Sequence, residues 1–311
     1  MQYATFGDYK ISRLSLGTVQ LGMEYGISNH AGKPPRKASL ELLQYATDAG
    51  INTLDTSPHY GNAEEIIGEF NGIRDKTLNV VTKFRISHDA AGNYAKAKDE
   101  VFRSVKTSLT SLKIHKIPVC LFHQQAGQPL QQMIELLERI LTDLKKEELI
   151  DIGGISIFNP EDMHIALATD VICAMQVPLN VFDQQLIRET ASGYLKNKLI
   201  FARSVFLQGL LLMHGNELPH HLKPAAPFLR RLNGLAEEAG MTTTELVFAF
   251  VRDIKEVSSV LIGALNLQQM KENLAMLHGK PLDESLKNSL MNNFAEVPAI
   301  VRSPWLWQVT H

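Results

Sequence analysis

The sequence of 311 residues predicts an α/β protein, a (β/α)8 TIM barrel with an N-terminal β-hairpin and an irregular C-terminal tail. Short apolar runs alternate with amphipathic segments along almost the whole chain. The runs are continuously apolar, as strands buried on both faces of a parallel sheet require. Eight strands that alternate with helices imply right-handed βαβ units, and the number eight favours a closed barrel.

The predicted strands are rich in β-branched and large apolar residues and are too short for typical helices. They cover residues 12–18, 51–57, 79–84, 117–123, 149–158, 170–178, 199–206 and 257–264. The segments between them, such as 38–50, 97–112 and 129–147, carry apolar residues at the spacing of amphipathic helices. Gly50 is expected to end the first of these helices.

Two segments lie outside this repeat. Residues 3–14 predict a hairpin with Gly7 and Asp8 at its turn, which could close the N-terminal end of the barrel. Residues 295–311 form the tail that is expected to be irregular, and they contain both tryptophans. The chain has no Gly/Ser linker and no low-complexity stretch, so we expect residues 1–311 to form one domain.

Composition excludes several classes of partner. The formal net charge is -2 and no basic run occurs, which argues against nucleic acid and anionic membranes as partners. No signal-peptide pattern begins the sequence, and no apolar run approaches the ~18 residues of a membrane span. Cys120 and Cys173 lie in apolar runs without metal-ligand spacing, so we expect buried free thiols, no metal and a reduced, cytoplasmic protein. Whether it is a monomer or a homo-oligomer is left open.

Polar side chains occur where three consecutive predicted strands end. Asp55 and Tyr60 follow the second strand, Lys83 ends the third and His123 ends the fourth. Each has a structural alternative: a loop cap, a loop anchor, a salt bridge of Lys83 with Asp55, and a buried barrel histidine. Because barrel enzymes carry their chemistry at this end of neighbouring strands, we expect the four to converge on one site.

These four residue types suit acid catalysis at a substrate oxygen. Tyr60 can donate a proton, and the ammonium of Lys83 would favour the phenolate that remains. The carboxylate of Asp55 would keep the buried ammonium charged, and His123 could orient the carbonyl oxygen or assist the proton relay. Together they would form a polarised pocket for the oxygen that becomes an alkoxide as hydride arrives.

The sequence closely resembles that of the aldo-keto reductase family. Residues 50–69, GINTLDTSPHYGNAEEIIGE, match the family signature with its Asp-x4-Tyr-Gly spacing. Further matches follow in order over nearly the whole chain: VVTKF, CLFHQ, IDIGGISIFNPEDM, MQVPLNVFDQ and SSVLIGALNLQQMKENL. By this resemblance Asp55, Tyr60, Lys83 and His123 form the catalytic tetrad of an NAD(P)H-dependent reductase.

The resemblance also implies a nucleotide site without a Rossmann fold. Ser156 and Gln176 would hold the nicotinamide carboxamide, and residues 204–209 would surround the pyrophosphate. The other expected nucleotide contacts are Arg203, Ser204, Leu207, Gln208, Gly209, Gly263, Asn266, Gln269, Glu272 and Asn273. The substrate would be an aldehyde or ketone, a sugar or another small carbonyl compound, that is reduced to the alcohol. A catalytically slow nucleotide sensor and a lyase or isomerase that uses Tyr60 without nucleotide remain alternatives.

Three departures from the family pattern concern the nucleotide. Ile157 stands where Asn often follows the serine, and Asn159 could replace that contact. Arg203 stands where many members place an aromatic ring, either as a contact to the nicotinamide or as an ion pair in the barrel. The usual 2′-phosphate clamp is depleted, with Lys271 as the one nearby cation. NADP(H) is the preferred expectation on family grounds, and NAD(H) or dual use is its rival.

Aromatic and histidine side chains near the expected barrel mouth are candidates for substrate contact. They are Tyr25, His59 and Trp305, with Trp307 as a further tail residue. An aromatic ring could form a wall against a sugar or a flat carbonyl compound. The alternative is that the tail only packs over the barrel. His214, His220 and His221 lack metal-ligand spacing and are expected to be solvated.

Overall fold

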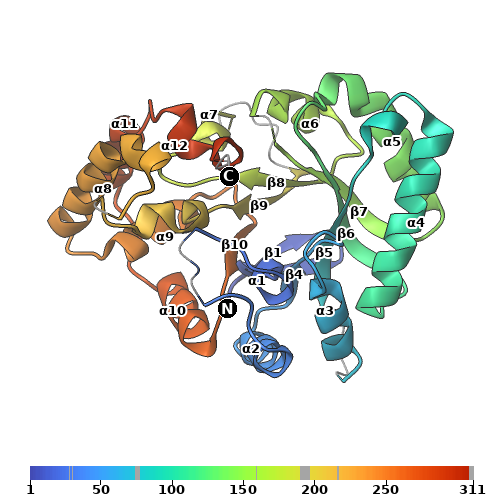
Figure 1. Ribbon diagram of the computed structural model, residues 1–311, viewed down its shortest axis with the longest axis horizontal. Coiled ribbons are helices and arrows are strands. Elements are labelled where there is room, and N and C mark those ends of the chain that lie inside the picture. The colour runs from blue at the N-terminus through green and yellow to red at the C-terminus, as the bar shows by residue number, and fades with distance from the viewer. Residues whose placement is uncertain are drawn as a thin grey trace.

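The computed structural model describes residues 1–311 except 28, 30, 74–77, 159, 190–196, 216 and 308–311. Eight parallel strands close into a barrel in the order β10-β3-β4-β5-β6-β7-β8-β9 (Figure 1). Their bounds are β3 Leu14–Gly17, β4 Thr53–Asp55, β5 Asn79–Phe84, β6 Ile117–His123, β7 Ile150–Ser156, β8 Ala174–Pro178, β9 Leu199–Arg203 and β10 Ser259–Gly263. Every barrel strand lies within a predicted one, so the (β/α)8 prediction is confirmed.

Helices connect the strands on the outside of the barrel. After β3 come α1 (Val19–Gly22) and α2 (Arg36–Asp48), and after the next strands α3 (Ala63–Asn71), α4 (Tyr94–Leu112), α5 (Leu130–Lys146), α6 (Met163–Ala168) and α7 (Gln185–Glu189). After β9 come α8 (Ala226–Glu238) and α9 (Thr243–Arg252), and after β10 come α10 (Leu267–Leu277), α11 (Glu284–Asn293) and α12 (Ala299–Arg302). Figure 1 shows α8, α9, α11 and α12 grouped on the side away from α4 and α5.

The helices form where the sequence places apolar residues three and four apart. In α5 the buried positions are Leu130, Met133, Leu137, Ile140, Leu141 and Leu144, which lie on one face of the helix. Helix α2 ends as predicted, because Gly50 follows its last turn with a φ of +95°. A side chain at that φ would be strained, so glycine is suited to this position.

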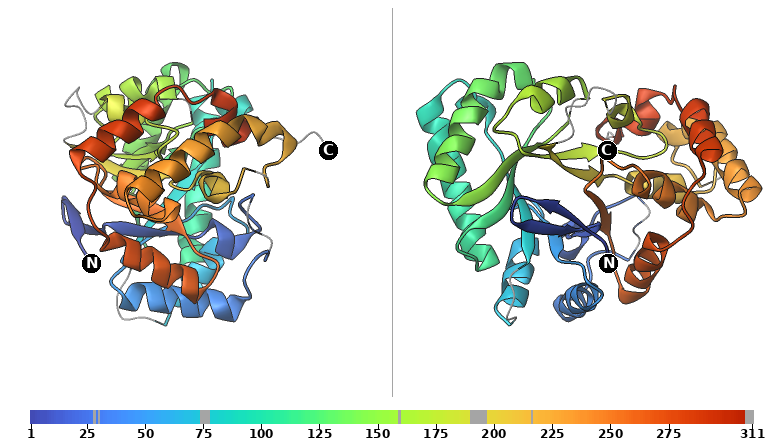
Figure 2. Two further views of the ribbon diagram at one scale, coloured as in Figure 1. Left: turned by 90° about the vertical axis from the view of Figure 1, so that its left-hand side faces the viewer. Right: turned by 180° about the vertical axis from the view of Figure 1, so that it is seen from behind.

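The N-terminal hairpin closes one end of the barrel. Strands β1 (Tyr3–Phe6) and β2 (Tyr9–Ser12) pair antiparallel around the predicted turn, which confirms the hairpin. Ile11 is fully buried and joins the apolar cluster inside the barrel. The hydroxyl of Tyr9 donates to Asp151, near the start of β7, at 2.5 Å. The hairpin, dark blue in Figure 2, therefore covers the N-terminal end, and the opposite end is left for a site.

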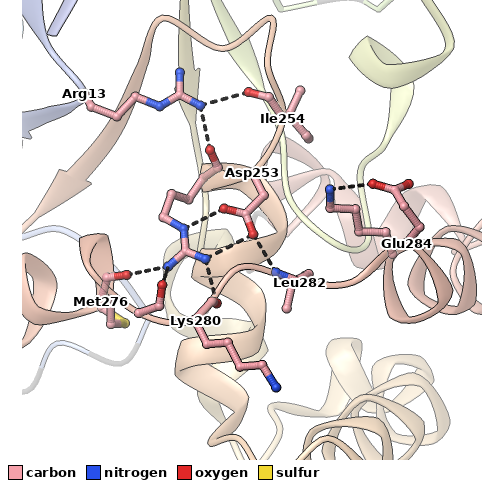
Figure 3. Close-up of polar contacts among 10 residues, drawn as sticks. Arg13, Asp253, Ile254, Met276, Lys280, Leu282 and Glu284 are labelled. Atoms are coloured by element: carbon pink, nitrogen blue, oxygen red, sulfur yellow. Dashed lines mark hydrogen bonds and ion pairs between the residues drawn. The ribbon is translucent and has the colours of Figure 1, made fainter. Parts of the chain in front are cut away.

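Two arginines, Arg13 and Arg252, link the last helices to the start of the barrel, and Figure 3 shows the contacts of Arg13. Arg252, at the end of α9, donates to the carbonyl oxygens of Met276, Gly279 and Lys280 at 2.8–3.0 Å. It also forms an ion pair with Asp253 at 2.7 Å. Arg13, directly before β3, donates to the carbonyl oxygens of Arg252 and Ile254. One guanidinium thus satisfies carbonyls that would otherwise be buried without partners.

Two expectations need adjustment. The tail is less irregular than expected, because it carries α12 and a 3₁₀ turn at Pro304–Leu306. Trp307 packs inward, 6% exposed, and donates to the carbonyl oxygen of Ile300 at 2.6 Å. Cys120 is a buried thiol as expected. Cys173 is only partly buried, since it directly precedes β8 at the N-terminal end of the barrel. None of the described helices combines the length and apolarity that a membrane crossing would demand.

Candidate active site

A cavity of about 1260 Å³ lies at the C-terminal ends of the barrel strands. The expected site residues that line it are Tyr25, Asp55, Tyr60, His123, Ser156, Gln176, Arg203, Ser204, Gln208, Gly209, Gly263, Gln269, Glu272, Asn273 and Trp305. Four expected residues do not line it: Lys83, His59, Leu207 and Asn266. Residues from most barrel strands therefore converge on one cavity, as the pattern of polar strand ends predicted.

An ion pair lies at the bottom of the cavity. The Nζ of Lys83 is 2.7 Å from Oδ1 of Asp55 and 2.8 Å from the carbonyl oxygen of Thr56. Both side chains are almost fully buried. Burial alone would lower the pKa of Lys83, but Asp55 and Tyr60 together outweigh it, so that pKa is raised and the ammonium stays charged. This ammonium lies 4.9 Å from the centroid of the Tyr60 ring.

Gln176 connects this ion pair to the next strands. Its Nε2 donates to Oδ1 of Asp55 at 2.6 Å, and its Oε1 accepts from the hydroxyl of Ser156 at 3.2 Å. Ser156 and Gln176 are register partners on β7 and β8. Asp55 therefore receives hydrogen bonds from both Lys83 and Gln176. The sequence placed Gln176 in this neighbourhood but did not predict its bond to Asp55.

The backbone around Tyr60 is held by a close contact of two glycines. Tyr60 lies in the turn between β4 and α3, and Gly61 follows it with a φ of +57°. A Cβ added to Gly22 would lie 1.7 Å from the carbonyl oxygen of Tyr60. A Cβ added to Gly61 would lie 2.2 Å from the carbonyl oxygen of Gly22. Only glycine allows this approach, which fixes Tyr60 against α1.

We expect Gly22→Ala to lower the free energy of unfolding by about 1–3 kcal/mol, because the obstructing atoms are backbone and cannot rotate away. Urea unfolding measures this change. Gly234→Ala on α8 is the matched control, since its Cβ meets nothing within 4 Å, and it should stabilise the protein by about 0.5–1 kcal/mol. Equal stability of the parent and Gly22→Ala would contradict the tight contact.

His123 is held neutral beside the ion pair. Burial and the neighbouring cations, with Lys83 first among them, lower its pKa from 6.5 to about 2. Its Nδ1 is buried and has no hydrogen-bond partner in the described part of the chain. A neutral imidazole can donate one hydrogen bond or accept one. The side chain can therefore contact an oxygen in the cavity without adding charge.

Arg203 bridges two strand ends. Its Nη2 donates to the carbonyl oxygen of Ile157 at 2.9 Å, and its Nη1 donates to the hydroxyl of Ser204 at 3.1 Å. Among the described residues no carboxylate forms an ion pair with it within 4.0 Å. The alternative of a barrel ion pair is therefore not seen, and its guanidinium lines the cavity. Asn159, the suggested substitute for the missing asparagine, lies outside the described residues.

The loop after β9 has an unusual backbone. Ser204, Leu207 and Gln208 have φ values of 61°, 49° and 55°, and Gly209 has 99°. Non-glycine residues seldom adopt this region, and each costs about 1–3 kcal/mol. Leu207 is buried and its N–H is bonded to the carbonyl oxygen of Ser204, so its side chain shapes the loop rather than the cavity wall. Such strain is typical of a preformed binding loop.

The far end of the cavity is formed by β10 and α10. Asn273 donates to the carbonyl oxygen of Gly263 at 3.1 Å. Asn266 caps α10, where its side chain accepts from the backbone of Gln269 at 2.9 Å. Lys271, the cation expected near a 2′-phosphate, instead lies 5.8 Å over the ring of Tyr45. It does not line the cavity.

Aromatic rings form the outer wall. Phe158 and Trp305 have ring centroids 4.6 Å apart and both line the cavity, as does Tyr25, which is 40% exposed. Trp307 is buried and does not line the cavity, which fits the alternative of a packing tail for that residue. His59 is exposed and does not line the cavity, and partial burial of its ring together with the charge of Arg85 lowers its pKa.

The sequence did not single out several residues that line the cavity. Gln20, Phe158, Arg252 and Lys280 are among them, with a stretch at 239–242 before α9. Basic character was the one available signal for Lys280. Phe158 carries no polar group, and nothing in the sequence pattern marked it. Among the described residues no group of three or more His, Cys, Asp or Glu side chains is placed to hold a metal ion.

Comparison with known proteins finds relatives that cover most of the chain. The chain is 24% identical to "Uncharacterized oxidoreductase YqkF" of Bacillus subtilis (strain 168), over 92% of this chain and 94% of that one. It is 27% identical to "L-galactose dehydrogenase" of Arabidopsis thaliana, over 86% and 84% of the two chains. It is 24% identical to "NADH-specific methylglyoxal reductase" of Escherichia coli (strain K12), over 93% and 96%.

Solved structures share the fold. The holo form of the aldo-keto reductase AKR11C1 from Bacillus halodurans superposes with a TM-score of 0.73 at 20% identity, over 97% and 98% of the two chains. The sequence model of the Aldo/keto reductase family matches residues 13–290. The chain is therefore an oxidoreductase that belongs to the aldo-keto reductase family, whose members use NAD(P)H.

Proposed function

We propose that this protein, as a single domain of residues 1–311, reduces an aldehyde or ketone to the alcohol with NAD(P)H. The observation that carries the proposal is the buried Lys83–Asp55 pair, with the ring of Tyr60 4.9 Å from the ammonium at one end of a large cavity. Relatives named as a galactose dehydrogenase and a methylglyoxal reductase support this class of reaction.

The cavity fits a dinucleotide. It runs from Tyr60 past the strained loop at 204–209 to Asn273 on α10, and its 1260 Å³ exceeds what a small carbonyl compound needs. Ser156 and Gln176 would hold the nicotinamide carboxamide beside Asp55, and the loop would surround the pyrophosphate. When bound, the nucleotide supplies the hydride.

Each residue of the tetrad has a role that its contacts support. Tyr60 donates the proton to the carbonyl oxygen as that oxygen gains negative charge. Lys83 stabilises the phenolate that remains, and Asp55 keeps the ammonium charged and in place. His123 is neutral at physiological pH, so it orients the carbonyl oxygen by a hydrogen bond rather than by charge.

The nucleotide that we propose as preferred is NADP(H), with Lys280 in place of the depleted clamp. Lys280 lines the cavity, whereas Lys271 lies over Tyr45. A phosphate dianion needs charged donors, and Lys280 is a cation on the side of the cavity formed by α9 and α10. The relative from Escherichia coli that is named NADH-specific supports the rival assignment.

Parallel fluorescence titrations with NADPH and NADH test this proposal, followed by turnover of an aldehyde and sugar panel with the tighter nucleotide. We expect Lys280→Ala to weaken NADPH about tenfold and leave NADH unchanged, because one charge-assisted contact is lost. Lys271→Ala is the matched control and should change neither. Absence of binding of both nucleotides to the parent would refute the reductase proposal, whereas tighter NADH would refute only the nucleotide preference.

A further inference from the structure

Two arginines lie near His123 on opposite sides of the barrel, Arg85 directly after β5 and Arg203 at the end of β9. The register pairs Lys83 with Leu121 and Phe84 with Phe122, so the next step along β5 and β6 places Arg85 beside His123. Arg85 follows the last residue of β5, two positions after Lys83, and its charge acts on both His123 and His59. Arg203 reaches the same region from the end of β9 and lines the cavity.

These two guanidinium groups have no carboxylate of their own. Neither is in an ion pair within 4.0 Å among the described residues, and Asp55 is already bound to Lys83. The positive charge of Arg203 acts on the carboxylate of Asp183, but Oδ1 of Asp183 accepts a hydrogen bond from Gln185. The positive charges of Lys83, Arg85 and Arg203 therefore all act on His123.

The guanidinium of Arg85 also has an N–H group that forms no hydrogen bond within the described residues. Its Nε is shielded from solvent and has no hydrogen-bond partner in the described part of the chain. The side chain is half-buried, and Nδ1 of the neighbouring His123 is orphaned in the same way. An unpaired buried donor on a cation costs about 1–3 kcal/mol or more, so an anion bound beside the half-buried guanidinium would stabilise it.

The effect of Arg85 on its neighbours agrees with this placement. Its positive charge contributes to the lowered pKa values of His123 and of His59. Arg203 faces the end of the cavity where Ser156 and Gln176 would hold the nicotinamide. Arg85, in contrast, lies within electrostatic reach of Tyr60 and His59.

We propose that Arg85 binds an acidic group, a carboxylate or a phosphate, on the substrate whose carbonyl is reduced at Tyr60. This inference rests on the proposed reductase function and specifies its substrate class. A guanidinium binds both anions through paired N–H donors, so the chemistry at Arg85 is the same for either. The terminal Nη1 and Nη2 groups, which are not shielded as Nε is, would supply those donors.

Matched pairs of aldehydes test this inference. The carboxylate pair is 4-oxobutanoate and its methyl ester, and the phosphate pair is glyceraldehyde 3-phosphate and glyceraldehyde. We expect the parent to prefer the anionic member of one pair by about tenfold or more in kcat/KM, as one charge-assisted contact implies. The pair that shows the preference identifies the acidic group.

Arg85→Gln should abolish this preference and change turnover of the neutral member by less than about threefold. Arg103→Gln, at an exposed position of α4, is the control and should keep the preference. Equal use of both members of each pair by the parent, or an equal loss on both in Arg85→Gln, would overturn the inference. Turnover of the neutral aldehydes tests the reductase function separately.

If no aldehyde is turned over, a ligand-binding measurement still tests the role proposed for Arg85. The fluorescence of Trp305, which lines the cavity, should respond to 4-oxobutanoate or glyceraldehyde 3-phosphate in the parent and not in Arg85→Gln. The absence of a saturable response to both anions in the parent would overturn the inference. Saturable responses of equal affinity in both proteins would overturn it as well.

Discussion

Replacing Tyr60 by phenylalanine is expected to lower kcat by about a thousandfold, within the range of 10²–10⁴ that general acids contribute. The variant keeps the aromatic ring beside the ammonium of Lys83 and loses only the hydroxyl that gives the proton. Oxidation of the reduced nucleotide with a good aldehyde at saturation measures the change.

Nucleotide binding separates a lost proton donor from a disturbed cavity. The dissociation constant of the preferred nucleotide should change less than about threefold in Tyr60→Phe, because the contacts proposed for it lie on other strands. Tyr3→Phe removes a hydroxyl that donates to the carbonyl oxygen of Gly50, far from the cavity, and should keep full turnover. Parental turnover in Tyr60→Phe would mean that another group supplies the proton.

Lys83→Met should damage both turnover and stability. The methionine leaves the Asp55 carboxylate buried with Gln176 as its remaining side-chain donor. Removal of one partner of a buried ion pair typically costs about 3–5 kcal/mol. We therefore expect the free energy of unfolding to fall by about that amount. We expect kcat to fall by more than about a hundredfold, since the phenolate loses its stabilising charge.

The double variant Asp55→Asn/Lys83→Met distinguishes these two losses. Without the carboxylate no uncompensated charge remains, and an asparagine can still accept the hydrogen bond of Gln176, so most of the stability should return. Turnover should stay low, because the ammonium is still missing. Urea unfolding and steady-state kinetics on the two proteins measure both effects. Recovery of turnover in the double variant would contradict the role given to Lys83.

The barrel was predictable because its strands are buried on both faces, which leaves continuous apolar runs that helices of this length do not show. The hairpin was predictable from its turn. The ends of the elements were less certain, and the predicted run 149–158 was longer than β7, since Ile157 and Phe158 are apolar for reasons other than strand pairing. In the tail, Trp307 is buried by local helical turns that the spacing of apolar residues did not predict.

The site was predictable where chemistry requires particular residue types. Asp55, Tyr60, Lys83 and His123 are polar residues at the ends of apolar strands, and the structure brings them together. Contacts that depend on three-dimensional proximity were not predictable. The bond from Gln176 to Asp55 joins residues 121 positions apart, and Lys280 reaches the cavity from a connection after α10.

The junction at Arg252 has a consequence for how the chain folds. Strand β3 pairs with β10, and Arg13 donates to the carbonyl oxygen of Arg252 across a separation of 239 residues. A ribosome must therefore complete β10 before the first strand acquires its second neighbour. Such a high contact order predicts slow closure, during which β3 exposes an unpaired edge. The hairpin that precedes β3 is local and can form early, so it would shelter the newly made interior before the ring is complete.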